Sequence, residues 1–479
     1  MTACYPLIEE IHMAPEPAWC FEAFARRPFS FFLDSGMDPG KLGRYSFMGS
    51  DPFLVLRSRG DEITLIRDGM EEIKKGNPFD VLGEFLETYS LETRESPVPF
   101  VGGAVGYFSY DLGHFIERLP DTVIDDLQLP ECYLAFYDAV VAYDHLEGKT
   151  FVISTGFPEL QESQRLRRAE ERLKELKNRT LLSPPPQISE DVLAGAGAKL
   201  RANFSHENYL KAVETAREYI CAGDIFQVNL SQRFESDIPV PPYELYKRLR
   251  KINPAPFANY FGFDGVSIVG ASPERFLKVR SDWVETRPIK GTKPRGKTAQ
   301  EDDELARSLR ASFKDRAENV MIVDLERNDI GRVCRYGTVK VTELAVLETY
   351  PTVFHLTSTV VGQLRDGKNR IDLLKATFPG GSITGAPKVR SMEIIDELEP
   401  TRRSVYTGSL GYLSFNGDMD LDIVIRTIIV KDSRAYFQVG GAITYDSDPE
   451  AEYIETLDKG RAMMQALGIS PESDVENVS

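Results

Sequence analysis

The most constraining feature of this sequence is a succession of short apolar runs, each ended by residues typical of turns. Near the start, the run at residues 29–33 ends at an Asp-Ser-Gly turn, and the runs at 44–49 and 53–56 are separated by Asp51-Pro52. Runs of about four to eight aromatic and branched residues between Gly, Pro and Asp are typical of β-strands. We therefore predict that residues 1–150 consist mostly of strands and turns.

One segment has the composition of a linker. It contains Pro184-Pro185-Pro186 and Gly195-Ala196-Gly197, and it follows a charged stretch, 158–178, that is helical in character. Clustered proline and glycine are typical of chain that joins two structured parts. The sequence is accordingly divided into an N-terminal region (1–180), a linker (181–200), a catalytic region (201–470) and a C-terminal tail (471–479).

Capping residues mark helices after the linker. Ser205 precedes a run with apolar residues at helical spacing that stops at Gly223. A long helix is predicted over 299–326, broken near Ser312. A second long helix is predicted to start at Asp448-Pro449, because an acidic N-cap followed by proline favours a helix start.

A hairpin is predicted between these two helices. Asn416-Gly417-Asp418 is a turn sequence, and it separates two apolar runs, 410–415 and 421–430. The second run is predicted to be one strand, with Arg426 inside it.

Composition excludes several classes of protein. The chain has 479 residues with 57 Lys and Arg against 74 Asp and Glu, a net charge of −17. Such an acidic chain repels nucleic acid and anionic membranes, so neither is expected as a partner. The five scattered cysteines form no CxxC pair, and neither a signal peptide nor a membrane-spanning run is found. We expect a cytoplasmic protein.

Lys290 lies on a turn, in Arg287-Pro288-Ile289-Lys290-Gly291-Thr292. Proline before the lysine and glycine after it favour a stiff entry followed by a tight turn. A lysine held in this way can point into a cleft. The alternative is a solvated lysine on a surface loop.

Two predicted helices carry acidic residues on one face. Asp315 and Glu318 are three residues apart, and Glu452, Glu455 and Lys459 are spaced i, i+3 and i+7. Carboxylates from two facing helices would make a sparse oxygen site of the kind that suits Mg²⁺. The alternative is a set of solvated acids, some of them paired with lysines.

Basic and backbone groups in the same region could hold an anion. Arg426 lies in an apolar run and needs either an internal acidic partner or a bound carboxylate. The amides of Gly440-Gly441, at the end of a predicted strand, could bind anionic oxygens. His355 is either a buried core residue or part of the site.

Together these segments are similar to the chorismate-utilising enzymes, the family of anthranilate, aminodeoxychorismate, isochorismate and salicylate synthases. The segments that carry the resemblance are Asp224 to Leu230, Ser272-Pro273-Glu274-Arg275-Phe276, Pro288 to Thr292, Ala317-Glu318-Asn319, Asp324 to Asp329, Gly381 to Lys388 and Asp448 to Thr456. The resemblance covers about residues 200–470 densely and extends to N-terminal stretches. It implies an α+β fold of two packed antiparallel sheets flanked by helices, with the active site in the cleft between the lobes.

Two positions distinguish the members of this family. The turn at Lys290 has alanine in anthranilate, isochorismate and salicylate enzymes, whereas aminodeoxychorismate synthase component I carries lysine, as here. Isochorismate and salicylate synthases have a water-activating lysine where this chain has Gln227. The resemblance therefore implies amination of chorismate to 4-amino-4-deoxychorismate in folate biosynthesis, with a separate glutamine amidotransferase supplying ammonia. The alternatives are anthranilate synthase component I and a non-catalytic chorismate-binding subunit.

The resemblance also implies roles for individual residues. Lys290 would attack the ring, and Glu274 would protonate the departing hydroxyl. Mg²⁺ would lie on Glu318 and Glu455, with Asp315 and Glu452 nearby. The substrate would be held by the residues Gln227, Gly291, Thr292, His355, Ser382, Tyr406, Arg426, Gly440, Gly441 and Lys459.

A second set of residues resembles the tryptophan pocket of the family. These residues are Leu33, Asp34, Ser35, Arg44, Tyr45, Ser46, Asn253, Pro254, Ala255, Pro256 and Phe257. The resemblance implies that tryptophan binds there, as a regulator or as a structural ligand. The alternative is simple packing between the lobes.

Overall fold

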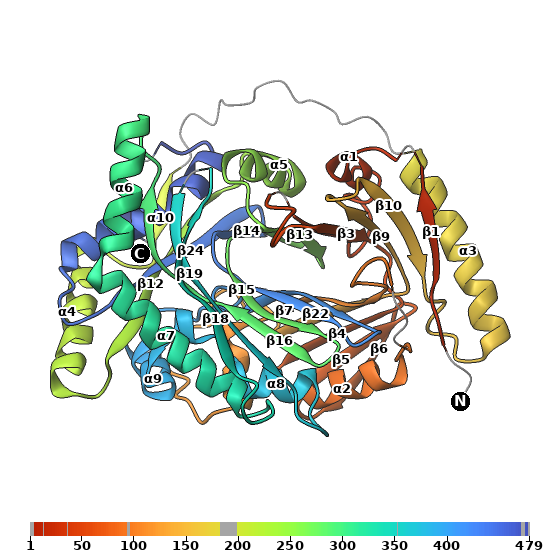
Figure 1. Ribbon diagram of the computed structural model, residues 1–479, viewed down its shortest axis with the longest axis horizontal. Coiled ribbons are helices and arrows are strands. Elements are labelled where there is room, and N and C mark those ends of the chain that lie inside the picture. Colours follow the sequence, from red (N-terminus) through yellow and green to blue (C-terminus); the bar gives the residue numbers. More distant parts are fainter. Residues whose placement is uncertain are drawn as a thin grey trace.

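Two large sheets dominate the computed structural model, which describes residues 4–12, 14–35, 37–92, 96–182, 199–351, 353–470 and 475–477. The sheets pack face to face and helices lie around them (Figure 1). Nearly all strand pairs are antiparallel. The predicted α+β fold of two packed antiparallel sheets is therefore confirmed.

The first sheet combines strands from both ends of the chain. Its spatial order is β1 (Leu7–Ile11), β10 (Lys149–Ser154), β9 (Ala139–Asp144), β3 (Tyr45–Gly49), β2 (Phe31–Asp34), β13 (Phe257–Phe263), β14 (Val266–Ser272), β23 (Thr427–Lys431), β24 (Arg434–Ile443), β12 (Gln227–Asp237), β11 (Leu200–Ala202) and β25 (Val475–Asn477), and β20 (Gly385–Ala386) pairs with β12.

The second sheet is also built from both ends of the chain. Its order is β17 (Ile289–Pro294), β19 (Val353–Gln363), β16 (Trp283–Arg287), β15 (Arg275–Arg280), β22 (Met419–Ile423), β21 (Ser409–Ser414), β7 (Gly103–Phe108), β8 (Cys132–Tyr137), β4 (Leu54–Arg59), β5 (Glu62–Arg67) and β6 (Met70–Lys75), and β18 (Lys340–Thr349) pairs with β19.

Helices cover the sheets and carry part of the site. They are α1 (Pro17–Phe21), α2 (Pro78–Thr88), α3 (Glu162–Leu181), α4 (His206–Ala222), α5 (Pro242–Ile252), α6 (Ala299–Ala311), α7 (Phe313–Gly331), α8 (Arg370–Thr377), α9 (Lys388–Leu398) and α10 (Pro449–Ala466), with the 3-10 helices η1 (Tyr110–Phe115) and η2 (Gly381–Ile383). Within the described ranges, none of these helices has the length and apolarity needed to span a membrane.

Aromatic side chains hold the two sheets together. Tyr133 of the second sheet packs on Phe263 of the first, with ring centroids 4.3 Å apart, and Tyr137 packs on Phe31 at 4.5 Å. All four rings are buried. Such rings combine a large apolar area with a preferred geometry, so they fix how one sheet lies on the other.

The predicted helix starts and the predicted break are confirmed at their caps, whereas the helix predicted to end at residue 326 continues to Gly331. The Ser205 hydroxyl accepts a hydrogen bond from the Asn208 amide, and Gly223 ends α4 in the left-handed conformation at φ 86°. Ser312 both ends α6 and caps α7, which is the predicted break. Asp448 caps α10, with Pro449 at its first position.

The predicted strand 421–430 is wrong, because the chain leaves one sheet and enters the other within it. β22 ends at Ile423 in the second sheet, and β23 begins at Thr427 in the first. Between them Arg426 adopts a left-handed φ of 53°. Both strands are buried and mostly apolar, so the sequence reads as one continuous apolar run.

The structure does not decide the predicted domain division. Most of the predicted linker, residues 183–198, lies outside the described residues, as does most of the tail after residue 470. Strands from 1–180 and 201–470 pair directly, since β2 pairs with β13 and β7 with β21. The division stays a prediction about the sequence.

A buried ion pair fixes the loop that carries Ser382. The Arg403 Nε and Nη2 atoms donate to Glu399 at 3.0 and 2.7 Å, and Arg403 Nη1 donates to the Ile383 carbonyl at 2.9 Å. Both charged side chains are almost fully buried. We expect Arg403→Met to lower the free energy of unfolding by about 3–5 kcal/mol, because it leaves the Glu399 charge buried and unpaired.

Urea unfolding measures this loss, and Arg335→Met is the matched control. Arg335 pairs with Asp366 at the surface, where an ion pair contributes about 1 kcal/mol or less. Equal losses in the two variants would contradict the importance of the buried pair.

Candidate active site

The Lys290 turn packs directly on α7. Lys290 is the second residue of β17, which begins directly after Pro288. The next residue, Gly291, has φ 88°. A Cβ atom on Gly291 would lie 3.0 Å from the Cβ of Asp315. Glycine is therefore needed here for its conformation and for the close approach of the helix. Lys290 as a whole residue is half-buried, whereas its amine is buried.

The surroundings of Lys290 favour its neutral form. Burial lowers the pKa of the Lys290 amine, and Lys459 lowers this pKa further, whereas Glu318, Glu274 and Glu455 act in the opposite direction. A lysine with a lowered pKa has more of the unprotonated amine that can act as a nucleophile.

Glu274 is a buried carboxyl beside this lysine. It lies between β14 and β15, is 4% exposed, and its Oε1 accepts a hydrogen bond from the Ile289 amide at 3.4 Å. Burial raises the pKa of Glu274 to about 7, although a hydrogen bond with Ser382 and the charge of Lys290 oppose the rise. A carboxyl with such a pKa can hold a proton at neutral pH and release it.

The predicted acidic residues of α7 and α10 face one region. Burial raises the pKa of Glu318, and Asp315 and Glu455 add to the rise. A Cβ atom on Gly441 would lie 2.9 Å from Glu452 Oε2 and 3.4 Å from Glu455 Oε1. These two carboxylates therefore lie directly over the Gly441 backbone.

Within this acidic group, the described residues leave one buried oxygen without a partner. Glu452 Oε1 accepts a hydrogen bond from Ser447 at 2.6 Å, whereas Glu452 Oε2 is buried and accepts none. Burial also raises the pKa of Glu452. A cation would satisfy this oxygen and relieve the repulsion between the acids.

These acids fit Mg²⁺ better than a metal that needs many protein ligands. No three Asp, Glu, His or Cys side chains of the described residues are close enough together to hold a metal by themselves. Mg²⁺ commonly takes one or two carboxylates and fills its remaining positions with waters and substrate oxygens. The residues present fit such a site.

Cationic and phenolic groups border the acids. The Lys459 ammonium donates to Glu455 Oε1 at 2.6 Å and to the Gly440 carbonyl at 2.7 Å. Because Lys459 and other cations outweigh the effect of burial, the pKa of Glu455 is lowered. Arg426 Nη1 donates to the Lys459 carbonyl, and the described residues place no carboxylate in ion-pair contact with Arg426. Burial raises the pKa of Tyr406 to about 12.

Two neutral side chains complete the set. His355 Nδ1 lies 2.8 Å from Thr292 Oγ1, and burial lowers the pKa of His355 to about 3, so its imidazole is neutral at physiological pH. Gln227 is 1% exposed, and both polar atoms of its amide lack a hydrogen-bond partner among the described residues. A buried amide of this kind is available to a ligand.

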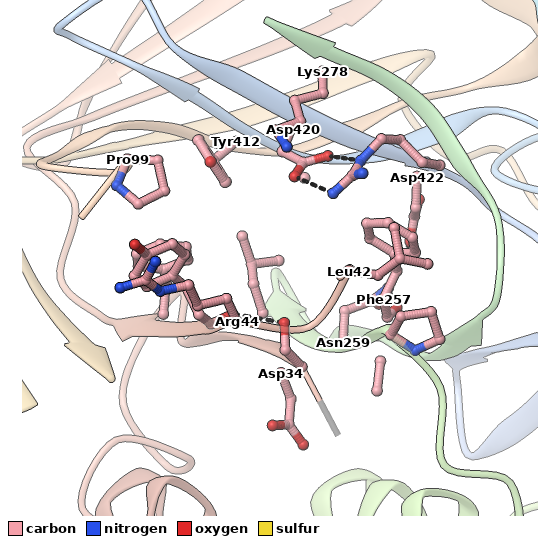
Figure 2. A pocket seen from close by; sticks show the side chains of 18 of the residues that line it. Asp34, Leu42, Arg44, Pro99, Phe257, Asn259, Lys278, Tyr412, Asp420 and Asp422 are labelled. Atoms are coloured by element: carbon pink, nitrogen blue, oxygen red, sulfur yellow. Dashed lines mark hydrogen bonds and ion pairs between the residues drawn. The ribbon is translucent and has the colours of Figure 1, made fainter. Parts of the chain in front are cut away.

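A cavity of about 260 Å³ lies between the two sheets. Figure 2 shows Asp34, Arg44 and Phe257 on one side of it and Tyr412 and Asp420 on the other. The predicted residues that line this cavity are Leu33, Asp34, Ser35, Arg44, Tyr45, Pro256 and Phe257. The other four predicted residues are not among its lining residues: Ser46, Asn253, Pro254 and Ala255.

The exceptions have local causes. The Ser46 hydroxyl is turned to the Asp34 carboxylate at 3.1 Å and to His145 at 2.7 Å. Asn253 is the residue that ends α5. The Asp34 carboxylate points away from the cavity, toward Tyr246 and Arg250 of α5 (Figure 2).

Comparison with known proteins places this architecture in a family. A model of the chorismate binding enzymes matches residues 37–465. The chain belongs to the chorismate-binding enzyme family.

Members of this family with two different names are about equally similar to the chain. Aminodeoxychorismate synthase component 1 of Bacillus subtilis (strain 168) is 42% identical over 91% of this chain and 92% of the relative. Anthranilate synthase component 1 of Acetivibrio thermocellus is 40% identical over 96% and 95%. The solved structure of anthranilate synthase component I from Streptococcus pneumoniae TIGR4 has a TM-score of 0.76 at 36% identity, covering 88% of this chain and 92% of that one.

Within this candidate site, sequence reasoning missed Asn229, Lys314 and Glu326. The side chain of Asn229 hydrogen-bonds Tyr406. Lys314 adds positive charge near Glu318, Glu452 and Glu455. Spacing along α7 does not single out Glu326, because eight residues from Glu318 correspond to about 80° around the helix axis.

The lowered pKa of Lys290 can be tested by chemical labelling. Glu318 is the largest of the effects that oppose this lowering, so Glu318→Gln should lower the pKa of Lys290 further. We expect Lys290 to react with an amine-acylating reagent at a lower pH in the variant than in the unchanged protein. Peptide mass spectrometry across a pH series measures the midpoint. The control is Asp324→Asn, an exposed acid of the same helix, and a midpoint that rises in Glu318→Gln would contradict the assignment.

Proposed function

We propose that this protein is an aminodeoxychorismate synthase component 1, which converts chorismate and ammonia to 4-amino-4-deoxychorismate and water. The observation that carries the proposal is the amine of Lys290, held beside Glu274 and the acids of α7 with a lowered pKa. The family turn carries a lysine at this position only in the aminodeoxychorismate synthases that the sequence resembles.

The first step uses Lys290 as a nucleophile. Its neutral amine forms a bond to C2 of the ring, the double bonds shift, and the C4–oxygen bond breaks. Glu274, whose pKa is raised to about 7, gives its proton to the departing hydroxyl, which leaves as water. One N–C bond forms and one C–O bond breaks, so the electrons balance.

The second step reverses the attachment. Ammonia adds at C4, the double bonds shift back, and the bond between C2 and Lys290 breaks. The proton lost by the adding ammonia returns to Glu274, which is then ready for another turnover. Lys290 ends as a free amine, so neither residue is consumed.

The neighbouring groups orient the anionic ring. Arg426 and Lys459 supply positive charge, and the Tyr406 hydroxyl and the amides of Gly440-Gly441 supply donors for carboxylate oxygens. Neutral His355, with Thr292, offers a hydrogen bond without competing for a proton. The amide of Gln227 cannot act as a base, which disfavours water as the nucleophile.

Glu318 and Glu455 would hold Mg²⁺, with Asp315 and Glu452 beside them. When bound, the ion supplies charge that neutralises the ring carboxylate and the surrounding acids. The unpartnered Oε2 of Glu452 supports this assignment.

Two further molecules belong to the proposed function. A glutamine amidotransferase subunit would supply the ammonia, as expected for a protein similar to the component 1 subunits. The cavity between the sheets would hold tryptophan, because Phe47, Tyr45 and Tyr412 offer aromatic walls while Arg44, Asp420 and Lys278 offer charges for an amino acid.

Anthranilate synthase is the second candidate function. It is favoured by the near-equal identity to anthranilate synthase component 1 of Acetivibrio thermocellus and by the fold of the Streptococcus pneumoniae protein. In that reaction pyruvate is lost from the ring, and no bond to Lys290 forms.

Lys290→Ala distinguishes the two reactions. We expect the variant to lose roughly a hundredfold or more of kcat, because the nucleophile is removed. The unchanged protein, incubated with chorismate and Mg²⁺ but no ammonia, should gain on Lys290 the mass of chorismate minus water. The control is Lys293→Ala in the same strand, whose ammonium bonds Ser308 instead. Anthranilate and pyruvate as products would refute the proposal.

Gly441→Ala tests the ion site. The added methyl group would meet Glu452 Oε2 at 2.9 Å, so we expect the Mg²⁺ concentration for half-maximal activity to rise about tenfold or more. Calorimetry of Mg²⁺ binding provides a readout independent of turnover. Gly83→Ala is the control, since its Cβ would meet only Ile371 at an ordinary 3.7 Å. Unchanged Mg²⁺ binding in Gly441→Ala would remove Glu452 and Glu455 from the proposed site.

A further inference from the structure

A second buried carboxyl lies next to the general acid and has no part in the chemistry described above. Glu326 of α7 is 2% exposed. Its Oε1 accepts a hydrogen bond from the Gly381 amide at 3.1 Å, and its Oε2 accepts one from Thr286 Oγ1 at 3.3 Å. A buried carboxyl is costly, so two donors from separate segments indicate a defined role.

The two donors belong to the segments that surround Glu274. Gly381 precedes Ser382, which hydrogen-bonds Glu274. Thr286 is a buried residue of β16, four residues before Lys290. Glu326 therefore joins the loop of Ser382 to the strand that leads into the lysine turn.

The contact at Gly381 is close, so a larger residue there would displace side chains of α7. A Cβ atom there would lie 2.6 Å from Leu325 Cδ2 and 3.1 Å from Glu326 Oε1. The loop backbone thus rests directly on α7, and a shift of the Glu326 carboxyl would move Ser382 with it.

We propose that Glu326 is a positioning residue for the general acid: it ties Ser382 and the Lys290 strand around Glu274, and the two neighbouring carboxyls do not ionise together, so that one proton stays on the pair. The proposal rests on the proposed function only in taking Glu274 as the general acid.

The charges that face Glu326 come from three elements. Asp329 lies on the same helix, Lys388 of α9 bonds both Asp329 and the Thr377 carbonyl, and Glu274 lies before β15. Burial raises the pKa of Glu326 to about 7, Asp329 and Glu274 add to the rise, and Lys388 opposes it. Because repulsion between two carboxylates is mutual, the carboxyls of Glu326 and Glu274 disfavour each other's ionised form, and one proton is retained by the pair.

Glu326→Gln tests the charge, because the amide keeps the shape and can still bond Gly381 and Thr286. A Glu whose folded pKa is raised holds its proton below that pKa and loses it as the pH rises. Without the neighbouring charge, the pKa of Glu274 falls. We expect the break near pH 7 in the kcat/KM profile for chorismate to move to lower pH by roughly one unit.

Asp324→Asn is the matched control, since it removes an exposed acid from the same helix, where its partner is Arg327. In Asp324→Asn, the break in the kcat/KM profile should stay at the pH found for the unchanged protein. If the break also stays at that pH in Glu326→Gln, the proposal is overturned, because a purely structural role would not move it. The mass of the product is measured in the same assays. A product other than 4-amino-4-deoxychorismate would show that the proposed function is wrong, whereas an unchanged break would show that the role of Glu326 is wrong.

Thr286→Val tests whether the hydrogen bond from Thr286 to Glu326 positions the site. It also provides a second test if Glu326→Gln folds poorly. It removes one donor and leaves the carboxyl in place. We expect kcat to fall roughly threefold to tenfold, the range for one lost hydrogen bond, with KM for chorismate unchanged. Full activity in both Thr286→Val and Glu326→Gln would overturn the positioning role.

Discussion

The desolvation of Lys290 among carboxylates is the interaction on which the site depends. A buried ammonium is costly, and the nearby acids reduce that cost by attracting the charge. The two effects oppose each other, and the balance leaves the pKa of Lys290 below its ordinary value. The two sheets are what make this balance possible. They bring the turn at Lys290, the segment at Glu274 and the helices α7 and α10 together, although these lie far apart in the sequence.

The same arrangement leaves polar groups of the protein without a protein partner. The amide of Gln227 and one oxygen of Glu452 are buried without partners among the described residues, and Arg426 makes no ion-pair contact there, although the charge of Glu455 acts on it. Orphaned polar groups cost stability in a folded chain. They are therefore expected where an anionic ring and a cation bind, and the arrangement of donors and acids matches the needs of both.

Much of this could be predicted because local signals are strong where a helix begins or ends. Ser205, Ser312 and Asp448 mark their helices in the sequence, and the spacing of the acids places them on one face. Arg426 could not be placed in this way, because two buried strands from different sheets leave no polar residue between them to mark the crossing. Glu326 was missed for a related reason. Its importance comes from Gly381 and Thr286, two partners that only the folded chain brings together.

Similarity of the whole chain cannot separate amination from pyruvate release, because both need the same scaffold, anion-binding groups and acids. The difference must lie in what attacks the ring. An amine that is permanently next to the ring has a far higher effective concentration than free ammonia. It therefore reacts first whenever it is neutral and correctly oriented. Under the proposed function, a lysine at position 290 directs the reaction through a covalent bond, and alanine in its place would leave the ring open to ammonia itself. One side chain, with the carboxyls that set its protonation, would then divide two activities on one fold.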